Sequence, residues 1–128
     1  MKYLLDTHTL LWIVTDDPQL SKRAVNYFLS ERNDIYFSIA GLWEMAIKIS
    51  LKKLILKQSL NEFFNEHIIG NNIRLLDIKT EHVLKLENLK FHHRDPFDRL
   101  VVCQCLVEKM AIISNDKIFS KYLVKRVW

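Results

Sequence analysis

Short apolar runs alternate along the chain with longer stretches in which apolar residues recur every three or four positions. The short runs are rich in β-branched and aromatic residues and are bounded by polar ones, a pattern typical of buried strands. They predict four strands and a fifth at the sheet edge, at residues 3–5, 35–38, 73–78, 111–114 and 124–128.

The longer stretches have the spacing of amphipathic helices. They predict helices at residues 8–14, 20–29, 39–51, 59–69, 80–89, 95–108 and 116–121. Strands that alternate with helices indicate a parallel sheet covered on both faces. The expected fold is therefore α/β, a three-layer α/β/α sandwich with a parallel sheet of four to five strands.

Local sequence signals predict where two of these helices begin and which face of a third is buried. Asp95 followed by Pro96 has the features of an N-cap and a first helical residue, and Thr80 is the expected N-cap of the helix at 80–89. In the helix at 39–51, the residues expected to face the core are Ile39, Leu42, Trp43, Ala46 and Ile47.

Composition fits one ordinary globular domain spanning residues 1–128, with 49% hydrophobic and 27% charged residues. No apolar stretch approaches the ~18 residues of a membrane span, so we expect no membrane partner and a cytoplasmic location. Cys103 and Cys105 lie two apart in a helical stretch, where they would point in different directions, and are expected to be reduced and buried. The net charge of +4 is a mild bias toward a polyanionic partner.

Acidic residues follow several of the predicted strands. In open parallel sheets, sites form outside the carboxyl ends of the strands. Asp6 ends the first strand, Asp116 lies two residues beyond the fourth, and Glu44 is on the helix that leaves the second. Asp98 begins the helix before the fourth strand, and it reaches the same edge only if the chain crosses over accordingly.

Each acid also has a purely structural interpretation. Asp6, Asp98 and Asp116 can stabilise helix N-termini, an effect worth ~1 kcal/mol. Glu44 lies beside an apolar stripe and has Lys48 four residues later as a partner for an ordinary helical ion pair.

Together, four converging carboxylates would repel one another and would need protons or hard cations. Mg²⁺ or Mn²⁺ suits such a site and supports phosphodiester hydrolysis. His92 and His93 are not expected to bind zinc, because adjacent histidines without a nearby cysteine are a poor ligand set. We expect them to contact substrate or solvent.

Four segments carry a family resemblance. They are Met1–Trp12, with Asp6-Thr7-His8; Ser38–Lys48, with Leu42-Trp43-Glu44; His92–Leu100, with Asp95-Pro96-Phe97-Asp98; and Ser114-Asn115-Asp116 with Phe119. In this order and spacing the chain resembles PIN-domain proteins of the VapC toxin class.

The resemblance implies a PIN-like fold and a Mg²⁺- or Mn²⁺-dependent endoribonuclease, the toxin of a type II toxin–antitoxin system. It implies an RNA substrate, a cognate antitoxin that covers the site, and a homodimer. Catalytic and metal-binding roles fall on Asp6, Glu44, Asp98 and Asp116. Substrate-contacting or supporting roles fall on Thr7, Lys48, Asp95 and Asn115.

Two other functions fit the sequence less well. An aspartyl phosphatase of the haloacid dehalogenase type also has an Asp after its first strand, but it needs a second Asp two residues later, where this chain has His8. A catalytically silent PIN fold that only binds RNA or protein would be expected to have a broken set of acids, and here the set is intact.

Overall fold

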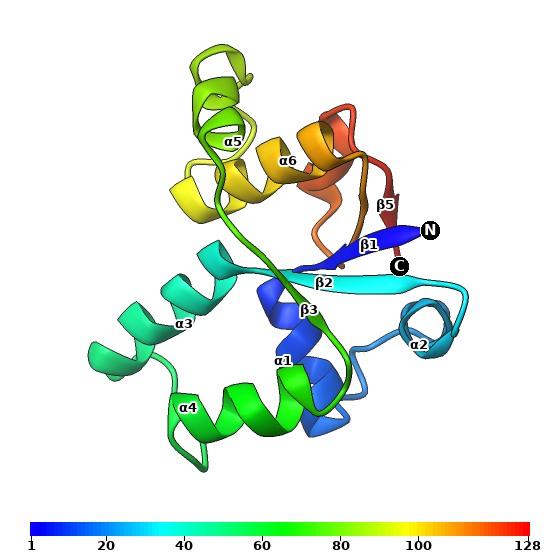
Figure 1. Cartoon of the computed structure of the whole chain (residues 1–128), viewed down its shortest axis with the longest axis vertical. Coiled ribbons are helices and arrows are strands. Elements are labelled where there is room, and N and C mark those ends of the chain that lie inside the picture. The colour runs from blue at the N-terminus through cyan, green and yellow to red at the C-terminus, as the bar shows by residue number, and fades with distance from the viewer.

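Strand β1 (Lys2–Leu5) lies at the centre of a five-stranded parallel sheet with the order β3-β2-β1-β4-β5 (Figure 1). The computed structural model describes residues 1–128. The other strands are β2 (Asp34–Ser38), β3 (Arg74–Leu76), β4 (Ala111–Ile113) and β5 (Arg126–Val127). The predicted parallel sheet is confirmed, including the edge strand at the end of the chain.

Helices cover both faces of this sheet (Figure 1). On one face lie α1 (Thr7–Thr15), α2 (Lys22–Leu29), α3 (Ile39–Ser50) and α4 (Leu60–Phe63), the last continued by the π-helical turn η1 (Phe64–Ile69). On the other lie α5 (Thr80–Lys85), η2 (Leu86–Asn88), α6 (Pro96–Glu108) and the 3₁₀ helix η3 (Lys117–Lys121). The three-layer α/β/α sandwich is therefore confirmed. No helix is long and apolar enough to cross a membrane.

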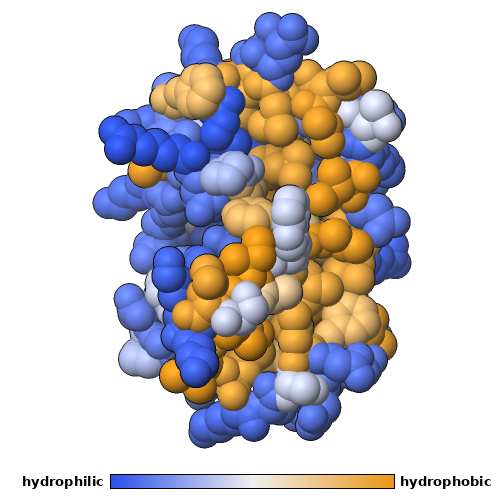
Figure 2. Space-filling model, turned by 90° about the vertical axis from the view of Figure 1, so that its left-hand side faces the viewer, coloured by the Kyte–Doolittle hydropathy of each residue, from blue (hydrophilic) through white to orange (hydrophobic).

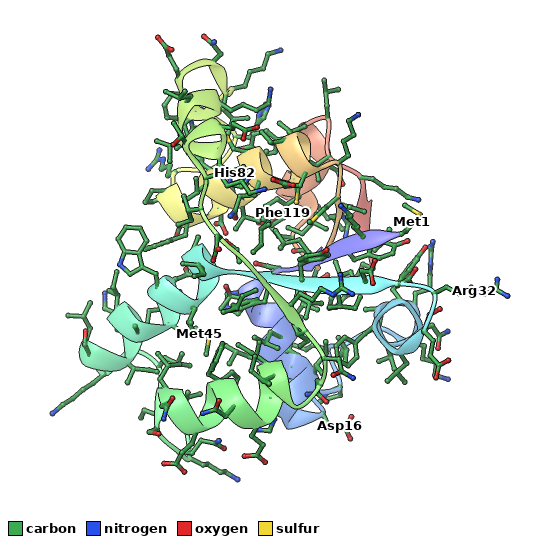
Figure 3. All side chains as sticks on the ribbon, in the orientation of Figure 1. Met1, Asp16, Arg32, Met45, His82 and Phe119 are labelled. Carbon is green, nitrogen blue, oxygen red and sulfur yellow. The ribbon has the colours of Figure 1, made fainter.

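The alternation of side chains along β1 divides the core in two. Tyr3 and Leu5 pack in one apolar cluster and Leu4 packs in the other, as the two-residue period of a strand requires. Met45 belongs to the first cluster and Phe119 to the second, and Figure 3 shows them on opposite sides of the sheet. A sheet buried on both faces explains why the strands are continuous apolar runs.

Both cysteines of α6, Cys103 and Cys105, are free and buried, as predicted. Burial raises the pKa of both thiols. They therefore behave as small apolar side chains in the packing of α6.

The expected N-cap of α5 was wrong by one residue. Thr80 is the first helical residue, and the capping position belongs to Lys79. The backbone N–H of Lys79 donates to Nδ1 of the fully buried His82, at 2.9 Å. Nε2 of the same ring lies 3.1 Å from Glu108 on α6. The His82 ring thus connects α5 to α6 and replaces the hydroxyl cap that the sequence suggested.

The inward face of α3 also differs from the prediction. Its buried residues are Ala40, Gly41, Glu44 and Met45. Trp43 is 55% exposed and Ile47 37% exposed. Because α3 carries apolar residues on more than one side, helical periodicity alone could not identify the face that meets the sheet. The small residues at 40 and 41 decide it, since they let the helix approach the core closely.

Gly41 provides a test of this close approach. A Cβ there would lie 2.6 Å from Cζ of Phe37 and 3.1 Å from Oγ1 of Thr7. A helical Gly-to-Ala exchange normally gains about 1 kcal/mol, whereas overpacking a core costs about 1–3 kcal/mol. We expect Gly41→Ala to lower the free energy of unfolding by about 1 kcal/mol in urea denaturation. A more stable Gly41→Ala protein would contradict the tight crossing of α1 and α3.

Candidate active site

The carboxyl edge of the sheet is level across its centre. Leu5 of β1 pairs with Phe37 of β2 and with Ile113 of β4. All three strands therefore end side by side, and the residues that follow them emerge at one place. Helix α6 ends only two residues before β4 begins, so its first turn lies back at this same edge. The crossing that the sequence left open thus brings Asp98 to the other acids.

Asp6 follows β1 directly and is the N-cap of α1. Its Oδ1 accepts from the backbone N–H of Thr7 at 2.9 Å, and its Oδ2 accepts from Oγ of Ser114 at 2.9 Å. Burial raises the pKa of Asp6, although the Ser114 hydrogen bond and the nearby His8 oppose the rise. This carboxylate is therefore held between the ends of β1 and β4 at an energetic cost.

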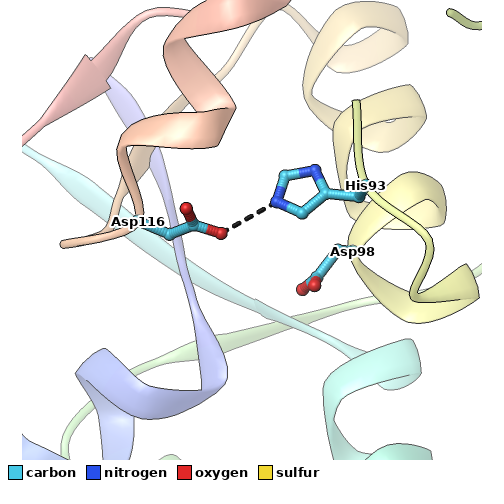
Figure 4. A group of neighbouring side chains, drawn as sticks. All are labelled: His93, Asp98 and Asp116. Carbon is cyan, nitrogen blue, oxygen red and sulfur yellow. Dashed lines mark hydrogen bonds and ion pairs between the residues drawn. The ribbon is translucent and has the colours of Figure 1, made fainter. Parts of the chain in front are cut away.

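Asp116 lies two positions after Ser114 and is the N-cap of η3. Its Oδ1 accepts from the backbone N–H of Ile118 at 2.9 Å. Its Oδ2 lies 2.8 Å from Nε2 of His93 (Figure 4). The backbone N–H of Asp116 donates to Oγ of Ser114 at 3.0 Å. Ser114 consequently joins Asp116 to Asp6 through one hydroxyl.

Asp98 is in the first turn of α6, which Asp95 caps as predicted. Oδ1 of Asp95 accepts from the backbone N–H of Phe97 at 2.8 Å and of Asp98 at 3.3 Å. Burial raises the pKa of Asp98 to about 7, and the negative charges of four neighbouring carboxylates add to the rise. These neighbours are Asp6, Asp95, Glu44 and Asp116. The side chain of Asp98 is therefore where the repulsion within the cluster is concentrated.

Glu44 reaches the edge from α3. It is 8% exposed, and one of its carboxylate oxygens lies 3.1 Å from Nζ of Lys48. The ordinary helical ion pair thus exists, and Glu44 is also close enough to raise the pKa of Asp98. Glu44 therefore forms the helical ion pair with Lys48 and also belongs to the acidic cluster.

The structure brings together all four predicted acids. The four residues predicted to support them each make different contacts. Thr7 contributes its backbone N–H to Asp6, Lys48 pairs with Glu44, and Asp95 caps α6. Asn115 lies exposed between Ser114 and Asp116. It adjoins the acids in the chain, but its side chain makes no hydrogen bond to them.

Two residues of the site were missed by the sequence. His93 was expected to contact substrate or solvent, yet it is only 7% exposed and bonds to Asp116. Ser114 is predicted as the last residue of a strand, and in the structure its hydroxyl joins two acids. The proximity of Ser114 to Asp116 in the sequence could have indicated its role. The partners of His93 are too distant in the chain for that.

The donor set fits a hard divalent cation. Ligand atoms of His93, Asp98 and Asp116 all lie within 4.8 Å of one another, and Asp6 and Glu44 are near enough to act on the charge of Asp98. Carboxylate oxygens are the ligands that Mg²⁺ and Mn²⁺ prefer. A groove lined by residues of α5, α6 and the segment around Tyr122 lies apart from these acids.

Comparison with known proteins agrees with this arrangement. The family model described as "PIN domain" matches residues 3–124. The chain belongs to the PIN domain family. Its match covers β1 through η3 and includes all four acids of the carboxyl edge.

Solved structures share the fold of this PIN domain at low sequence identity. VapBC2 from Rickettsia felis, bound to a DNA fragment from its promoter, has a TM-score of 0.74 and 16% identity, covering 99% of this chain and 98% of that one. DNA-bound VapBC from Salmonella typhimurium has a TM-score of 0.69 and 14% identity, with coverages of 99% and 97%. FitAcB from Neisseria gonorrhoeae has a TM-score of 0.70 and 16% identity, with coverages of 98% and 96%. No curated protein sequence matches the chain.

The raised pKa of Asp98 predicts how the metal-free PIN domain responds to pH. Between the usual aspartate pKa of 3.8 and about 7, the folded state binds more protons than the unfolded state, so stability falls as pH rises. We expect Asp98→Asn to make stability depend less on pH and to stabilise the metal-free protein at pH 8 by about 2 kcal/mol. This figure is the free energy of the pKa shift reduced for screening by solvent.

Urea denaturation at pH 5.5 and pH 8 in the presence of EDTA measures this effect. Asp77→Asn is the matched control, because Asp77 is an exposed acid just after β3 and its exchange should leave the pH dependence unchanged. An Asp98→Asn protein that is less stable than wild type at pH 8 would show that Asp98 is not strained by its neighbours.

Proposed function

We propose that the chain is a Mg²⁺- or Mn²⁺-dependent endoribonuclease that hydrolyses phosphodiester bonds of RNA at the carboxyl edge of its sheet. The observation that carries this proposal is the convergence of Asp6, Glu44, Asp98 and Asp116. Burial raises the pKa of Asp98 to about 7, and the negative charges of the neighbouring carboxylates add to the rise. Such repulsion is relieved by a bound cation. The PIN family membership of the chain agrees with this chemistry.

Each acid has a separate place in the proposed site. Asp6, Glu44 and Asp98 would hold the ion, and Asp116 would hold it or orient the attacking water. When bound, the ion supplies positive charge to the phosphate oxygens and lowers the pKa of water. Asp6 is fixed by Thr7 and Ser114 through bonds to both of its oxygens, so it can bind without paying the entropy of ordering a free side chain.

Neighbouring residues support the acids in this proposal. Lys48 forms an ion pair with Glu44 at 3.1 Å and is half-exposed, so its ammonium group can also contact a phosphate. Asp95 sets the start of α6 and thereby the position of Asp98. Thr7 and the exposed Asn115 lie at the rim of the edge, where they can contact the substrate backbone. The net charge of +4 favours an RNA partner.

The proposal extends to a partner protein. The similar structures from Rickettsia felis and Salmonella typhimurium are VapBC complexes with DNA. We propose that this chain is likewise the toxin of a toxin–antitoxin pair and that a segment of the antitoxin covers the carboxyl edge.

The first experiment removes one acid of the cluster. Asp6→Asn keeps the side-chain oxygen that accepts from Thr7 but removes a negative charge. We expect RNA cleavage in Mg²⁺ or Mn²⁺ to fall by roughly 100-fold or more, because ligand loss removes most of the charge stabilisation. Cleavage of a labelled RNA pool, read on a gel, measures it, with Asp77→Asn as the control that should cut at the wild-type rate.

Two outcomes distinguish the alternatives. Equal cleavage by Asp6→Asn and wild type would overturn the metal-dependent mechanism. If wild type binds RNA but never cuts it in either metal, the chain is a silent PIN fold that acts only by binding.

An exposed apolar stripe supports the proposed homodimer. Trp43 and Ile47 of α3 and its C-cap residue Leu51 follow one another at four-residue intervals and are 55%, 37% and 58% exposed. Figure 2 shows a continuous apolar area on the face of the molecule that includes α3. The Trp43 ring packs edge-on against Phe97 of α6, with centroids 5.0 Å apart. Monomeric proteins rarely expose so continuous a patch.

We expect the wild-type protein to be a dimer at micromolar concentration and Trp43→Glu to shift it toward monomer by at least tenfold in dissociation constant. A charge buried in an apolar contact without a partner costs enough for this shift. Light scattering coupled to size exclusion measures the mass. Leu29→Glu is the control, because Leu29 is 67% exposed on α2 and away from α3. A wild-type monomer would contradict the proposed dimer.

A further inference from the structure

His93 lies next to Asp98 and Asp116, two of the four acids of the cluster. It belongs to the loop that precedes α6, and its ring is enclosed by residues of the segment that follows β4. The ring centroid is 4.6 Å from that of Phe119 and 5.6 Å from that of Tyr122, with the Tyr122 ring almost parallel at 4°. The exposed fractions of His93 and Tyr122 are 7% and 8%. The imidazole is therefore enclosed by two aromatic rings and is shielded from solvent.

The hydrogen bonds of this ring determine where its proton lies. The backbone N–H of His93 donates to the Tyr122 hydroxyl oxygen at 2.9 Å, and Nδ1 of the ring lies 3.1 Å from the same oxygen. An ionised Asp116 carboxylate can only accept a hydrogen bond, so Nε2 carries the ring proton and Nδ1 accepts from the Tyr122 hydroxyl. Nε2 donates this proton to Oδ2 of Asp116 at 2.8 Å. In the imidazolium form Nε2 carries a proton as well.

A nitrogen that carries a proton has no lone pair for a metal ion. Although its ring lies within 4.8 Å of Asp98 and Asp116, His93 in this arrangement is a donor to a carboxylate and not a ligand. Figure 4 shows Nε2 facing Asp116 while the carboxylate of Asp98 lies beside the ring.

We propose that His93, oriented by Tyr122, is a positioning residue that fixes the carboxylate of Asp116 for metal binding and catalysis. The inference rests on the proposed metal-dependent nuclease function. The backbone N–H of Ile118 donates to one oxygen of Asp116 and His93 bonds to the other, so two hydrogen bonds hold this carboxylate in its observed orientation. The bond also connects the loop that begins α6, and hence Asp98, to the segment that carries Asp116.

The experiment compares three substitutions in the hydrogen-bonded relay from Tyr122 through His93 to Asp116. His93→Leu removes the donor to Asp116, His93→Gln can restore an N–H near the position of Nε2, and Tyr122→Phe keeps the stacked ring but removes the hydroxyl. The matched control is His67→Gln, since His67 lies on η1 on the opposite face of the sheet. Mn²⁺ affinity is measured by electron paramagnetic resonance titration without RNA, and kcat and KM with a short RNA substrate.

We expect His93→Leu to weaken Mn²⁺ binding by about tenfold and to lower kcat by about 10- to 100-fold, as loss of a hydrogen-bond partner of a ligand does, with KM changing less than threefold. His93→Gln should recover most of the Mn²⁺ affinity, Tyr122→Phe should show a smaller loss in the same direction, and His67→Gln should match wild type.

Wild-type Mn²⁺ affinity and kcat in His93→Leu would overturn the proposal. A rise in KM alone would also overturn it, because His93 would then contact RNA. If His93→Leu does not fold, Tyr122→Phe decides, and an unchanged Mn²⁺ affinity in that variant overturns the relay. If wild type binds Mn²⁺ but cuts no RNA, the nuclease function fails, while the effect of His93 on Mn²⁺ affinity still tests the positioning. Absence of Mn²⁺ binding by wild type overturns both.

Discussion

Parallel pairing of β1 between β2 and β4 is the constraint from which the rest of the molecule follows. It places Leu5 level with Phe37 and Ile113, and the backbone N–H of Asp6 continues the ladder by donating to the Ile113 carbonyl at 3.2 Å. Oγ1 of the buried Thr9 donates to the same carbonyl at 2.9 Å. The carboxylate that follows β1 is therefore fixed by the sheet itself, and the loops after β2 and β4 are brought to it. Charge accumulates at this edge because the strands are parallel and end together.

The hydrogen bonds that begin the helices are the same ones that hold the acids in place. Asp6 and Asp116 each use one oxygen to cap a following helix and the other to accept from a side chain of another segment. Asp98 instead relies on the cap supplied by Asp95 and has its own carboxylate free within the cluster. Capping and chemistry are thus compatible, because a carboxylate has more lone pairs than a helix start requires. The stability of the helix starts offsets part of the repulsion that the site creates.

The sequence was sufficient for features that depend on neighbouring residues and insufficient for those that depend on the crossing of segments. Strand ends predicted the positions of Asp6 and Asp116, and the Asp95-Pro96 pair predicted the start of α6. The place of Asp98 required the path from β3 to β4, which no local pattern encodes. The predicted inward face of α3 was wrong because apolar residues surround most of this helix. Only its contact with the sheet determines that Ala40 and Gly41 face inward. His93 was misjudged because its partners are 23 and 29 residues away.

The hydrogen bond between Ser114 and Asp6 spans 108 residues of chain. During synthesis Asp6 leaves the ribosome well before β4, the Ser114 hydroxyl and Asp116, because 108 residues of chain separate Asp6 from Ser114. Until then β1 lacks one of its two neighbours and Asp6 lacks both the strand end and the hydroxyl that hold it. A partly made chain therefore has no assembled acidic site. The topology thus couples assembly of the acidic edge to the emergence of β4 and Asp116.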